Sequence, residues 1–549
     1  MVEQHDSNKL IGHIIEYCAK HAVITLFLIV AASFWGYRSL LSTPVDALPD
    51  LSEVQVIVYS EWSGRSPDLI EDQVSYPLTT SLLSVPHVKV VRAQSFMGTS
   101  FVYVIFDEDT DIYWARSRVM EFLQTASKKL PADVELSLGP DATGVGWVYE
   151  YALDDKSGNH NLADLRSLQD FKLRPWLEAV SGVAEIASIG GFEKEYQISV
   201  DPHKLAQYGV TLQQIIHAVR RSNNDVGGRV LEIAGHEHFI RGRGYIKSVA
   251  DIKKIVLQSN SKGVPLLLES VATVNLGPAM RRGVAELDGE GETVGGIVIM
   301  RYGEDAMQVI QAVKQRLDSV RQSLPDGVEI ITTYDRSSLI DRAIHTLKQT
   351  LIEEIIVVLL VILLFLRHYR IALIAVATLP IAILLAFIPL QQHQISTNIM
   401  SLGGIAVAIG AMVDAGIVML DNIHRRLGQQ SLESIPRQTL IIKSMQEVGP
   451  SIFFSLAIIT LSFLPVFVFE GTEGRLFQPL AYTKTYAMGF AAILSITLTP
   501  ALAVLLLQRP TNPKKDKLNR WFYAAYQPLV MSALQRRFWV LILSLYQSQ

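Results

Sequence analysis

A carboxylate and two thioethers lie close together in a stretch of otherwise small and apolar residues. The segment AIGAMVDAGIVMLDN, residues 408–422, places Asp414 between Met412 and Met419. A carboxylate in apolar surroundings is suited to binding and releasing a proton, because desolvation disfavours its charged form. Thioether sulfur is a soft ligand that selects Cu(I) and Ag(I) over hard divalent cations. Such a helix could therefore handle both a proton and a soft metal ion.

A helical wheel separates the two kinds of group. At about 100° per residue, Met412 and Met419 fall one above the other and well away from Asp414, whereas Met400 falls nearer to the carboxylate. A third stripe consists of small residues suited to close helix packing, namely Gly404, Ala408, Ala411 and Ala415. The helix is therefore expected to have a carboxylate face, a methionine edge and a tightly packed face.

These residues also have ordinary structural interpretations. Asp414 could be held by hydrogen bonds, although a carboxylate within a membrane is by default a functional hypothesis. Methionine is an adaptable core residue, so Met400, Met412, Met419 and Met488 could simply fill space. Without further information, both interpretations of the methionines stay open.

A second metal-like pattern is GHEHF, residues 235–239. On a strand, His236 and His238 would point to the same face. They fit either a metal site or an exposed strand with two ordinary histidines, since no third ligand lies nearby in the sequence.

Composition narrows the function classes. The mean hydropathy of +0.26 and the 19% of charged residues are atypical of a soluble protein. A single cysteine, Cys18, excludes an internal disulfide framework and a cysteine-rich metal site. The net charge of -4 indicates no nucleic-acid partner, and the sequence has no GxxxxGK[ST] phosphate loop to suggest ATP as an energy source.

Six segments are long and apolar enough to cross a membrane. They lie near residues 21–37, 349–366, 371–390, 397–420, 448–469 and 480–507, and a seventh begins in 537–549. Lys and Arg are concentrated in the segments on one side, whereas the short loops 391–396 and 470–479 on the other side contain only Arg475. The positive-inside rule then places the N-terminus in the cytoplasm and residues 38–344 outside.

The large outer region has the strand and helix pattern of two ferredoxin-like βαββαβ subdomains. The second is interrupted by an inserted unit at about 203–290, and EYQISVD (195–201) is assigned to its sheet. The predicted fold class is a multi-pass α-helical membrane protein with a large periplasmic α+β domain. The predicted order is 1–37, the N-terminus and first membrane helix; 38–344, the periplasmic region; 345–510, membrane helices two to six; 511–536, an interfacial amphipathic segment; and 537–549, the start of a seventh helix.

Several stretches resemble a known transporter family over essentially the whole chain. PVDALPDLSEVQVIVYSEW, GAMVDAGIVMLDN and EGTEGRLFQPLAYTKTYAM resemble the heavy-metal efflux branch of the resistance-nodulation-division (RND) superfamily, and within it the copper/silver exporters. The resemblance implies an inner-membrane proton antiporter rather than an enzyme, without a bound cofactor, that exports Cu(I) or Ag(I). It also implies a homotrimer with a periplasmic adaptor and an outer-membrane channel as partners.

The resemblance assigns roles to individual residues. Asp414 matches the proton-relay aspartate, and Met400, Met412, Met419 and Met488 match methionines that pass the ion along the fourth and sixth helices. One departure is Ala503, where copper pumps of the family tend to carry a further methionine. The family's members are about twice as long and consist of two similar halves. The resemblance therefore covers an N-terminal half, without the partners of the relay aspartate.

Four alternatives to copper or silver export follow from the same sequence. A protein with this fold could export another heavy metal such as Zn, Co or Cd, or it could export a hydrophobic drug. A transmembrane sensor would also place a large domain after its first helix, but it would not need four further helices. The chain could finally be a fragment that binds partners without transporting anything.

Overall fold

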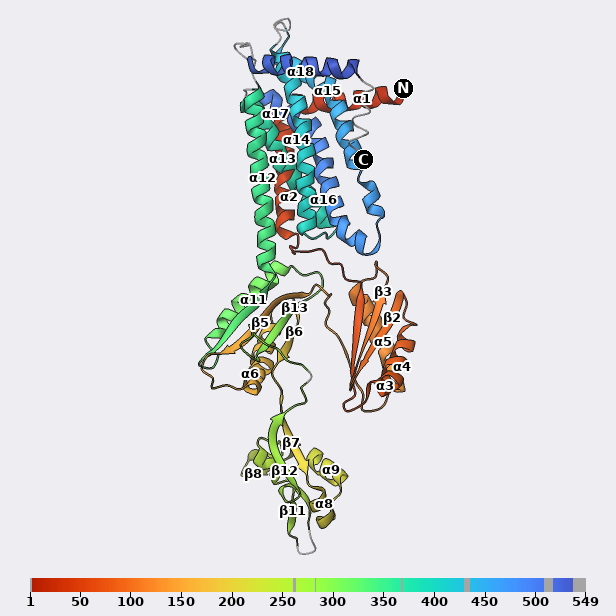
Figure 1. Cartoon of the computed structure of the whole chain (residues 1–549), viewed down its shortest axis with the longest axis vertical. Helices are drawn as coiled ribbons and strands as arrows, with labels where there is room; N and C mark the ends of the chain where they lie inside the picture. The colour runs from red at the N-terminus through yellow and green to blue at the C-terminus, as the bar shows by residue number, and fades with distance from the viewer. Residues whose placement is uncertain are drawn as a thin grey trace. The chain divides into compact units, whose positions relative to one another are not determined.

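The computed structural model of the chain describes residues 2–259, 263–281, 283–366, 369–428, 435–507 and 517–536. The side chains of residues 2–8, 365–366, 413–415 and 517–523 are outside this description. The chain divides into two compact units (Figure 1). The first comprises Met1–Val148, Met300–Gln311 and Asp335–Gln549, and the second comprises Tyr149–Ile299 and Ala312–Tyr334.

The first unit contains a four-stranded sheet covered by helices. Its strands are β1 (Gln55–Glu61), β2 (Val88–Phe96), β3 (Thr99–Phe106) and β4 (Glu135–Leu138), in the order β2-β3-β1-β4. The helical segments α3 (Pro67–Ile70), η1 (Glu71–Ser75) and α4 (Tyr76–Leu82) connect β1 to β2, and α5 (Ile112–Ala126) connects β3 to β4. Alternate residues of β1 are buried, as expected for a strand with one face against helices. Asp111 begins α5 by accepting a hydrogen bond from the Trp114 backbone N–H at 2.8 Å.

A second four-stranded sheet belongs largely to the second unit. Its strands are β5 (Trp147–Asp155), β6 (Val183–Gly190), β13 (Val294–Met300) and β14 (Val328–Asp335), in the order β14-β5-β13-β6. Its helical segments are α6 (Leu162–Leu168), η3 (Gln169–Leu173), α7 (Arg174–Glu178) and α11 (Ala306–Arg321). All residues of β13 are buried, which explains why its sequence VGGIVIM is apolar throughout rather than alternating.

Between β6 and β13 the chain forms an inserted α+β region. Its elements are β7 (Lys194–Val200), α8 (Pro202–Tyr208), α9 (Leu212–Ser222), β8 (Val226–Ile233), β9 (His236–Gly242), α10 (Val249–Lys253), β10 (Val256–Ser259), β11 (Pro265–Leu267), η4 (Leu268–Ser270) and β12 (Ala272–Pro278). The prediction that residues 195–201 belong to the second sheet was wrong, because β7 pairs along its length with β12. Gly190 and Gly191, at φ 70° and 60°, turn the chain out of that sheet. A Cβ at Gly190 would lie 2.1 Å from the Thr293 carbonyl oxygen, so no other residue fits this turn.

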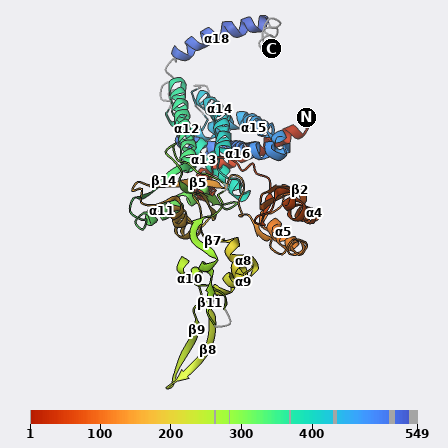
Figure 2. The ribbon, with the colours of Figure 1, turned by 60° about the horizontal axis from the view of Figure 1, so that its bottom comes forward.

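The strands β8 and β9 form an arm, Val226–Gly242, whose strand residues are all exposed (Figure 2). Its two-residue turn, Ala234 and Gly235, has φ values of 52° and 76°, which match the right-handed twist of a tight hairpin. The turn fixes the register of the arm, and the register fixes which side chains share a face. The cross-strand pairs nearest the turn are Ile233 with His236, Glu232 with Glu237, Leu231 with His238 and Val230 with Phe239.

The remaining helices contain the segments predicted to cross a membrane. They are α1 (Val2–Lys20), α2 (Ala22–Ser42), α12 (Ser337–Leu366), α13 (Tyr369–Gln392), α14 (Ile399–Leu427), α15 (Arg437–Leu461), η6 (Leu464–Val468), α16 (Gly471–Ile496), α17 (Leu498–Leu506) and α18 (Lys517–Gln535). Among the described residues, α2, α13, α14 and the stretch Arg437–Val468 are long and apolar enough to span a bilayer, and α16 with α17 forms a fifth candidate. The predicted segment 349–366 is the C-terminal part of α12 and falls outside this set.

Two further predicted segments differ from the structure or lie beyond it. The segment 480–507 was predicted as one continuous helix, but the chain bends by 42° between α16 and α17 at Thr497. Helix α16 also begins earlier, at Gly471. The start of a seventh helix at 537–549 lies outside the described residues, and the amphipathic segment 511–536 corresponds in its described part to α18.

The small-residue stripe of α14 permits one close helix contact. A Cβ built on Gly404 would lie 2.6 Å from the Leu480 carbonyl oxygen of α16. Ala408, one turn further along, is also buried in the shared core of these helices. That core also contains side chains from α1, α12, α13, α15, α16 and α17. The predicted packing role of Gly404 is therefore confirmed.

A connector, residues 43–52, joins α2 to β1 and is held by the helices around it. The backbone N–H of Asp46 donates to the Thr397 carbonyl at 3.1 Å, just before α14, and the Thr397 N–H donates to the Pro44 carbonyl at 2.8 Å. Arg336, at the start of α12, forms an ion pair with the Asp46 carboxylate at 3.4 Å. Burial raises the pKa of Asp46, and the Arg336 charge opposes this shift.

The same connector is fixed to α16 by an arginine. The Arg475 guanidinium donates hydrogen bonds to the carbonyls of Leu51 and Ser52. It also lies 3.5 Å from the Glu108 carboxylate, between β3 and α5. Three helices, α12, α14 and α16, are therefore linked to the chain segment that enters the first sheet.

The contact at Gly404 generates a stability prediction. We expect Gly404→Val to destabilise the protein by about 1–3 kcal/mol, because the added methyls would force α14 and α16 apart. Thermal unfolding in detergent measures the change. Gly403→Val is the matched control, since a Cβ at Gly403 meets no atom within 4 Å. Equal destabilisation by the two variants would show that helix propensity, and not the contact with Leu480, sets the effect.

Candidate functional site

Helix α14 carries most of the candidate site, and its first turn is firmly fixed. The Asn398 side chain accepts a hydrogen bond from the Ser401 N–H at 3.0 Å, and the Ser401 hydroxyl accepts one from the Asn398 N–H at 2.7 Å. This reciprocal capping box satisfies two N–H groups that have no partner within the helix. The capping box therefore fixes the residue at which α14 begins.

One face of α14 is left uncovered by the described part of the chain. Val407 is 54% exposed and Val418 is 53% exposed, and Gly410 and Asp421 are exposed on the same stripe. Position 414 falls in the middle of this stripe, because these residues recur on one side of a helix with 3.6 residues per turn. The side chain of Asp414 itself lies outside the described residues.

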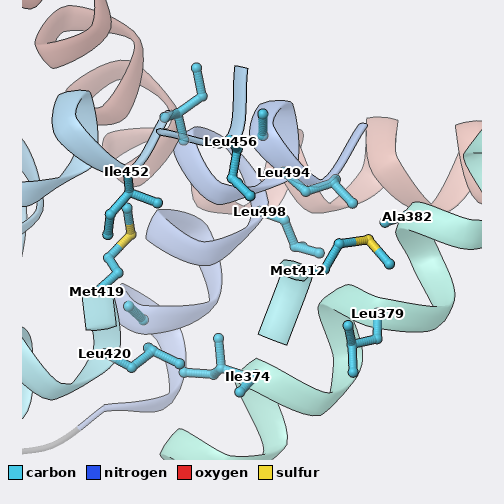
Figure 3. Close-up of a cluster of buried hydrophobic side chains, with 14 of the residues drawn as sticks. Ile374, Leu379, Ala382, Met412, Met419, Leu420, Ile452, Leu456, Leu494 and Leu498 are labelled. Atoms are coloured by element: carbon cyan, nitrogen blue, oxygen red, sulfur yellow. The ribbon is translucent and has the colours of Figure 1, made fainter. Parts of the chain in front are cut away.

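The predicted methionines do not form one cluster in the described structure. Met412, Met419 and Met488 are buried in the helical core, and Met400 is partly buried at the start of α14. Figure 3 shows the Met412 side chain extending toward Ala382 and Leu379 of α13, and Met419 toward Ile452 of α15. The two side chains thus meet different neighbouring helices, α13 and α15, although the wheel places them on one edge.

A small cavity of about 20 Å³ adjoins Met412. Its lining comes from α13, α14, α16 and α17 and consists of Thr378, Leu379, Met412, Gly416, Ala491, Ser495 and Thr499. This volume accommodates about one water-sized particle. The lining thus includes one thioether residue and three hydroxyl residues around a space of the size of a single ion or water. The three hydroxyls donate hydrogen bonds to backbone carbonyls, which leaves their oxygen lone pairs as possible ligands. Sequence reasoning missed the three hydroxyl residues, whose signal was only their position inside apolar segments.

A buried cation on α16 was also missed. Lys484 is buried, and its Nζ lies 2.9 Å from the centroid of the Phe463 ring. The described residues contain no carboxylate within ion-pair distance of it. A lysine buried in an apolar segment is costly, which makes Lys484 a candidate functional residue. The signal in the sequence was a single charge within the segment 480–507.

The histidine pair lies on the arm. His236 and His238 belong to β9 and are exposed on the same face. No group of three or more His, Cys, Asp or Glu side chains is arranged to hold a metal ion in the part of the chain that the structure describes.

Comparison with known proteins extends over nearly the whole chain. Residues 14–547 match the family described as AcrB/AcrD/AcrF. The chain is 51% identical to "Cation efflux system protein CusA" of Escherichia coli (strain K12) and 50% identical to "Putative cation efflux system protein SilA" of Salmonella typhimurium. Each alignment covers 95% of this chain and 51% of the relative, so the chain spans about half the length of these curated relatives.

A solved structure gives the same answer for the fold. A crystal structure of a heavy metal efflux pump (crystal form II) superimposes with a TM-score of 0.83 at 28% identity, over 97% of this chain and 51% of that one. Its match includes both the apolar helices and the sheet-containing regions, since it covers almost all of the chain. The chain belongs to the AcrB/AcrD/AcrF family of RND transporters and has the fold of about half of such a pump.

Proposed function

We propose that the chain is the N-terminal half of an inner-membrane exporter that moves Cu(I) or Ag(I) in exchange for protons. The observation that carries this proposal is the small cavity beside Met412, which combines a soft thioether with hydroxyl oxygens inside a helical bundle. The buried Met488 and the partly buried Met400 supply further soft ligands on α16 and α14. An exporter of Zn or Co would favour carboxylate and imidazole ligands over a thioether, and neither carboxylate nor imidazole lines this cavity.

The proton would be carried by Asp414. Its position on the uncovered stripe of α14 supports this role, because a relay carboxylate needs a partner on a facing element. The described part of the chain leaves that stripe open, and the relatives are about twice as long as this chain. We therefore propose that a second half covers the stripe and completes the proton path. Lys484 is a further buried charge that the same path could use.

The two four-stranded sheets would be ferredoxin-like porter subdomains. Each follows the chain order βαββαβ and has its first strand at an inner position, next to its third and fourth strands. The inserted region between β6 and β13 would be the docking unit. Both subdomains would lie in the periplasm, which agrees with the Lys and Arg distribution of the loops.

The partners would be a periplasmic adaptor, an outer-membrane channel and two further copies of the complete pump. The arm supports self-association, because Phe239 is 80% exposed and faces Val230 across the hairpin. An isolated two-stranded hairpin is marginally stable in water, so an arm with exposed apolar side chains is expected to pack on another surface. Two interpretations compete with export of copper or silver: a fragment without transport activity, and an exporter of hydrophobic drugs.

The relay role of Asp414 is testable by metal resistance. In a host without its own copper and silver exporters, supplied with the second half of a relative, we expect Asp414→Asn to abolish resistance to silver. The amide cannot take up and release a proton, whereas membrane insertion should be unchanged. Asp421→Asn, exposed at the end of the same helix, is the control and should keep resistance. Full resistance in the Asp414 variant would refute the relay assignment.

The metal role of Met412 is testable by binding. We expect Met412→Leu to weaken Ag⁺ binding by the purified chain by roughly tenfold or more, because one soft ligand is lost while side-chain volume is kept. Isothermal titration measures the affinity. Met445→Leu, equally buried on α15 but not part of the cavity lining, is the control. An unchanged affinity in Met412→Leu would exclude the cavity as an ion site.

The role of the arm is testable by oligomeric state. We expect Phe239→Ser to raise the dissociation constant of the oligomer at least about tenfold, since a buried aromatic anchor would be removed. Light scattering in detergent gives the mass of the complex. Phe171→Ser is the control, because Phe171 is 84% exposed in the same unit but lies on η3. Equal masses for the unmodified protein, Phe239→Ser and Phe171→Ser would contradict packing through the arm.

A further inference from the structure

The end of the arm presents two imidazoles in a defined geometry. The turn at Ala234 and Gly235 fixes the register, so His236 lies opposite Ile233 and His238 opposite Leu231. Both histidines therefore stand on one face of the hairpin, with apolar cross-strand neighbours and no cation opposite them. Neither imidazole has a hydrogen bond or ion pair among the contacts described for the chain, and both are exposed.

The charge around the pair favours a cation. Glu232 and Glu237 are opposite each other on the reverse face of the hairpin. Glu237 lies between the two histidines in the sequence, and Glu232 lies between their two cross-strand neighbours. Two like charges directly across a hairpin disfavour it in isolation. A bound cation close to the turn would reduce that repulsion, so binding and the local stability of the arm would reinforce each other.

The number of ligands selects the kind of ion. Alternate Cα atoms of a strand are roughly 6.6 Å apart, which allows two histidine side chains to reach a single ion between them. Structural zinc needs four ligands, and no group of three or more suitable side chains occurs in the described chain. Imidazole is a donor for zinc, nickel and copper alike, so the ligand type does not select the ion. The number of ligands does, because monovalent copper and silver bind two ligands in a linear arrangement, whereas zinc needs four.

We infer that His236 and His238 form a two-imidazole binding site for a monovalent copper or silver ion at the end of the arm. The site uses no residue of the proposed translocation route and lies in the second unit, whereas Met412 and its cavity lie in the first. The site would bind an ion at the end of the arm, and this binding would not require that the ion be transported. Ion binding at the arm is therefore independent of the proposed transport route.

The test uses the full chain in detergent, with Ag⁺ as the probe and histidine modification by diethyl pyrocarbonate as the readout. Peptide mapping by mass spectrometry reports the modification of each histidine. We expect Ag⁺ to protect His236 and His238 together, while His203, exposed on α8, remains reactive. Protection of all three, or of none, would overturn the inference.

A rearranged variant separates geometry from composition. Glu237→His combined with His238→Glu keeps two histidines and one glutamate but places the histidines on opposite faces of β9. Because chelation by two linked ligands is lost, we expect Ag⁺ affinity at the arm to fall at least about tenfold. Equal protection in this variant would show that single, unpaired histidines bind the ion. Met412→Leu should leave the protection unchanged, so failure of the proposed transport route would not be confused with failure of this site.

Discussion

The backbone contact between α14 and α16 at Gly404 and Leu480 fixes the geometry of the candidate site. The cavity beside Met412 is lined from both helices, by Gly416 on one side and by Ala491 and Ser495 on the other. A space this small exists only while the two helices keep their distance, because protein interiors are packed to near-crystalline density. The absence of a side chain at position 404 thus contributes to the close spacing of the two helices that line the cavity.

The connector extends this constraint beyond the helical bundle. Its backbone pairs with Thr397 immediately before the capping box of α14, and Arg336 and Arg475 hold it to the first turns of α12 and α16. Most of these bonds are to backbone groups, which cannot change rotamer as an exposed ion pair can. A displacement of α14 along its axis would therefore act directly on the segment that leads into β1. In the half-buried Asp46–Arg336 pair, the Asp46 carboxyl is the group of this linkage whose pKa is shifted.

Much of this organisation follows from periodicity in the sequence. The position of Asp414 on a helix, and the βαββαβ order of the first sheet, could be predicted because each depends on local patterns. The assignment of residues 195–201 failed because Gly190 and Gly191 redirect the chain, and a strand pattern does not name its partner strand. The hydroxyls of Thr378, Ser495 and Thr499 could not be predicted as a group, since three helices must meet before they share a cavity. The wheel likewise placed Met412 and Met419 on one edge, but could not tell that α13 covers one and α15 the other.

The bend at Thr497 has an electrostatic consequence for that cavity. Helix α16 ends at Ile496, one residue after Ser495 of the cavity lining, and α17 begins at Leu498. The negative end of one helix dipole therefore meets the positive end of the next at the bend, and the two offset each other. The Thr497 and Thr499 hydroxyls donate to the carbonyls of Ile493 and Leu494, so hydroxyl groups satisfy carbonyls of the last turn of α16. The described lining of the cavity is thus polar at this end without an ionised side chain. Because neither peptide groups nor hydroxyls titrate near neutral pH, this polarity is the same across the physiological pH range.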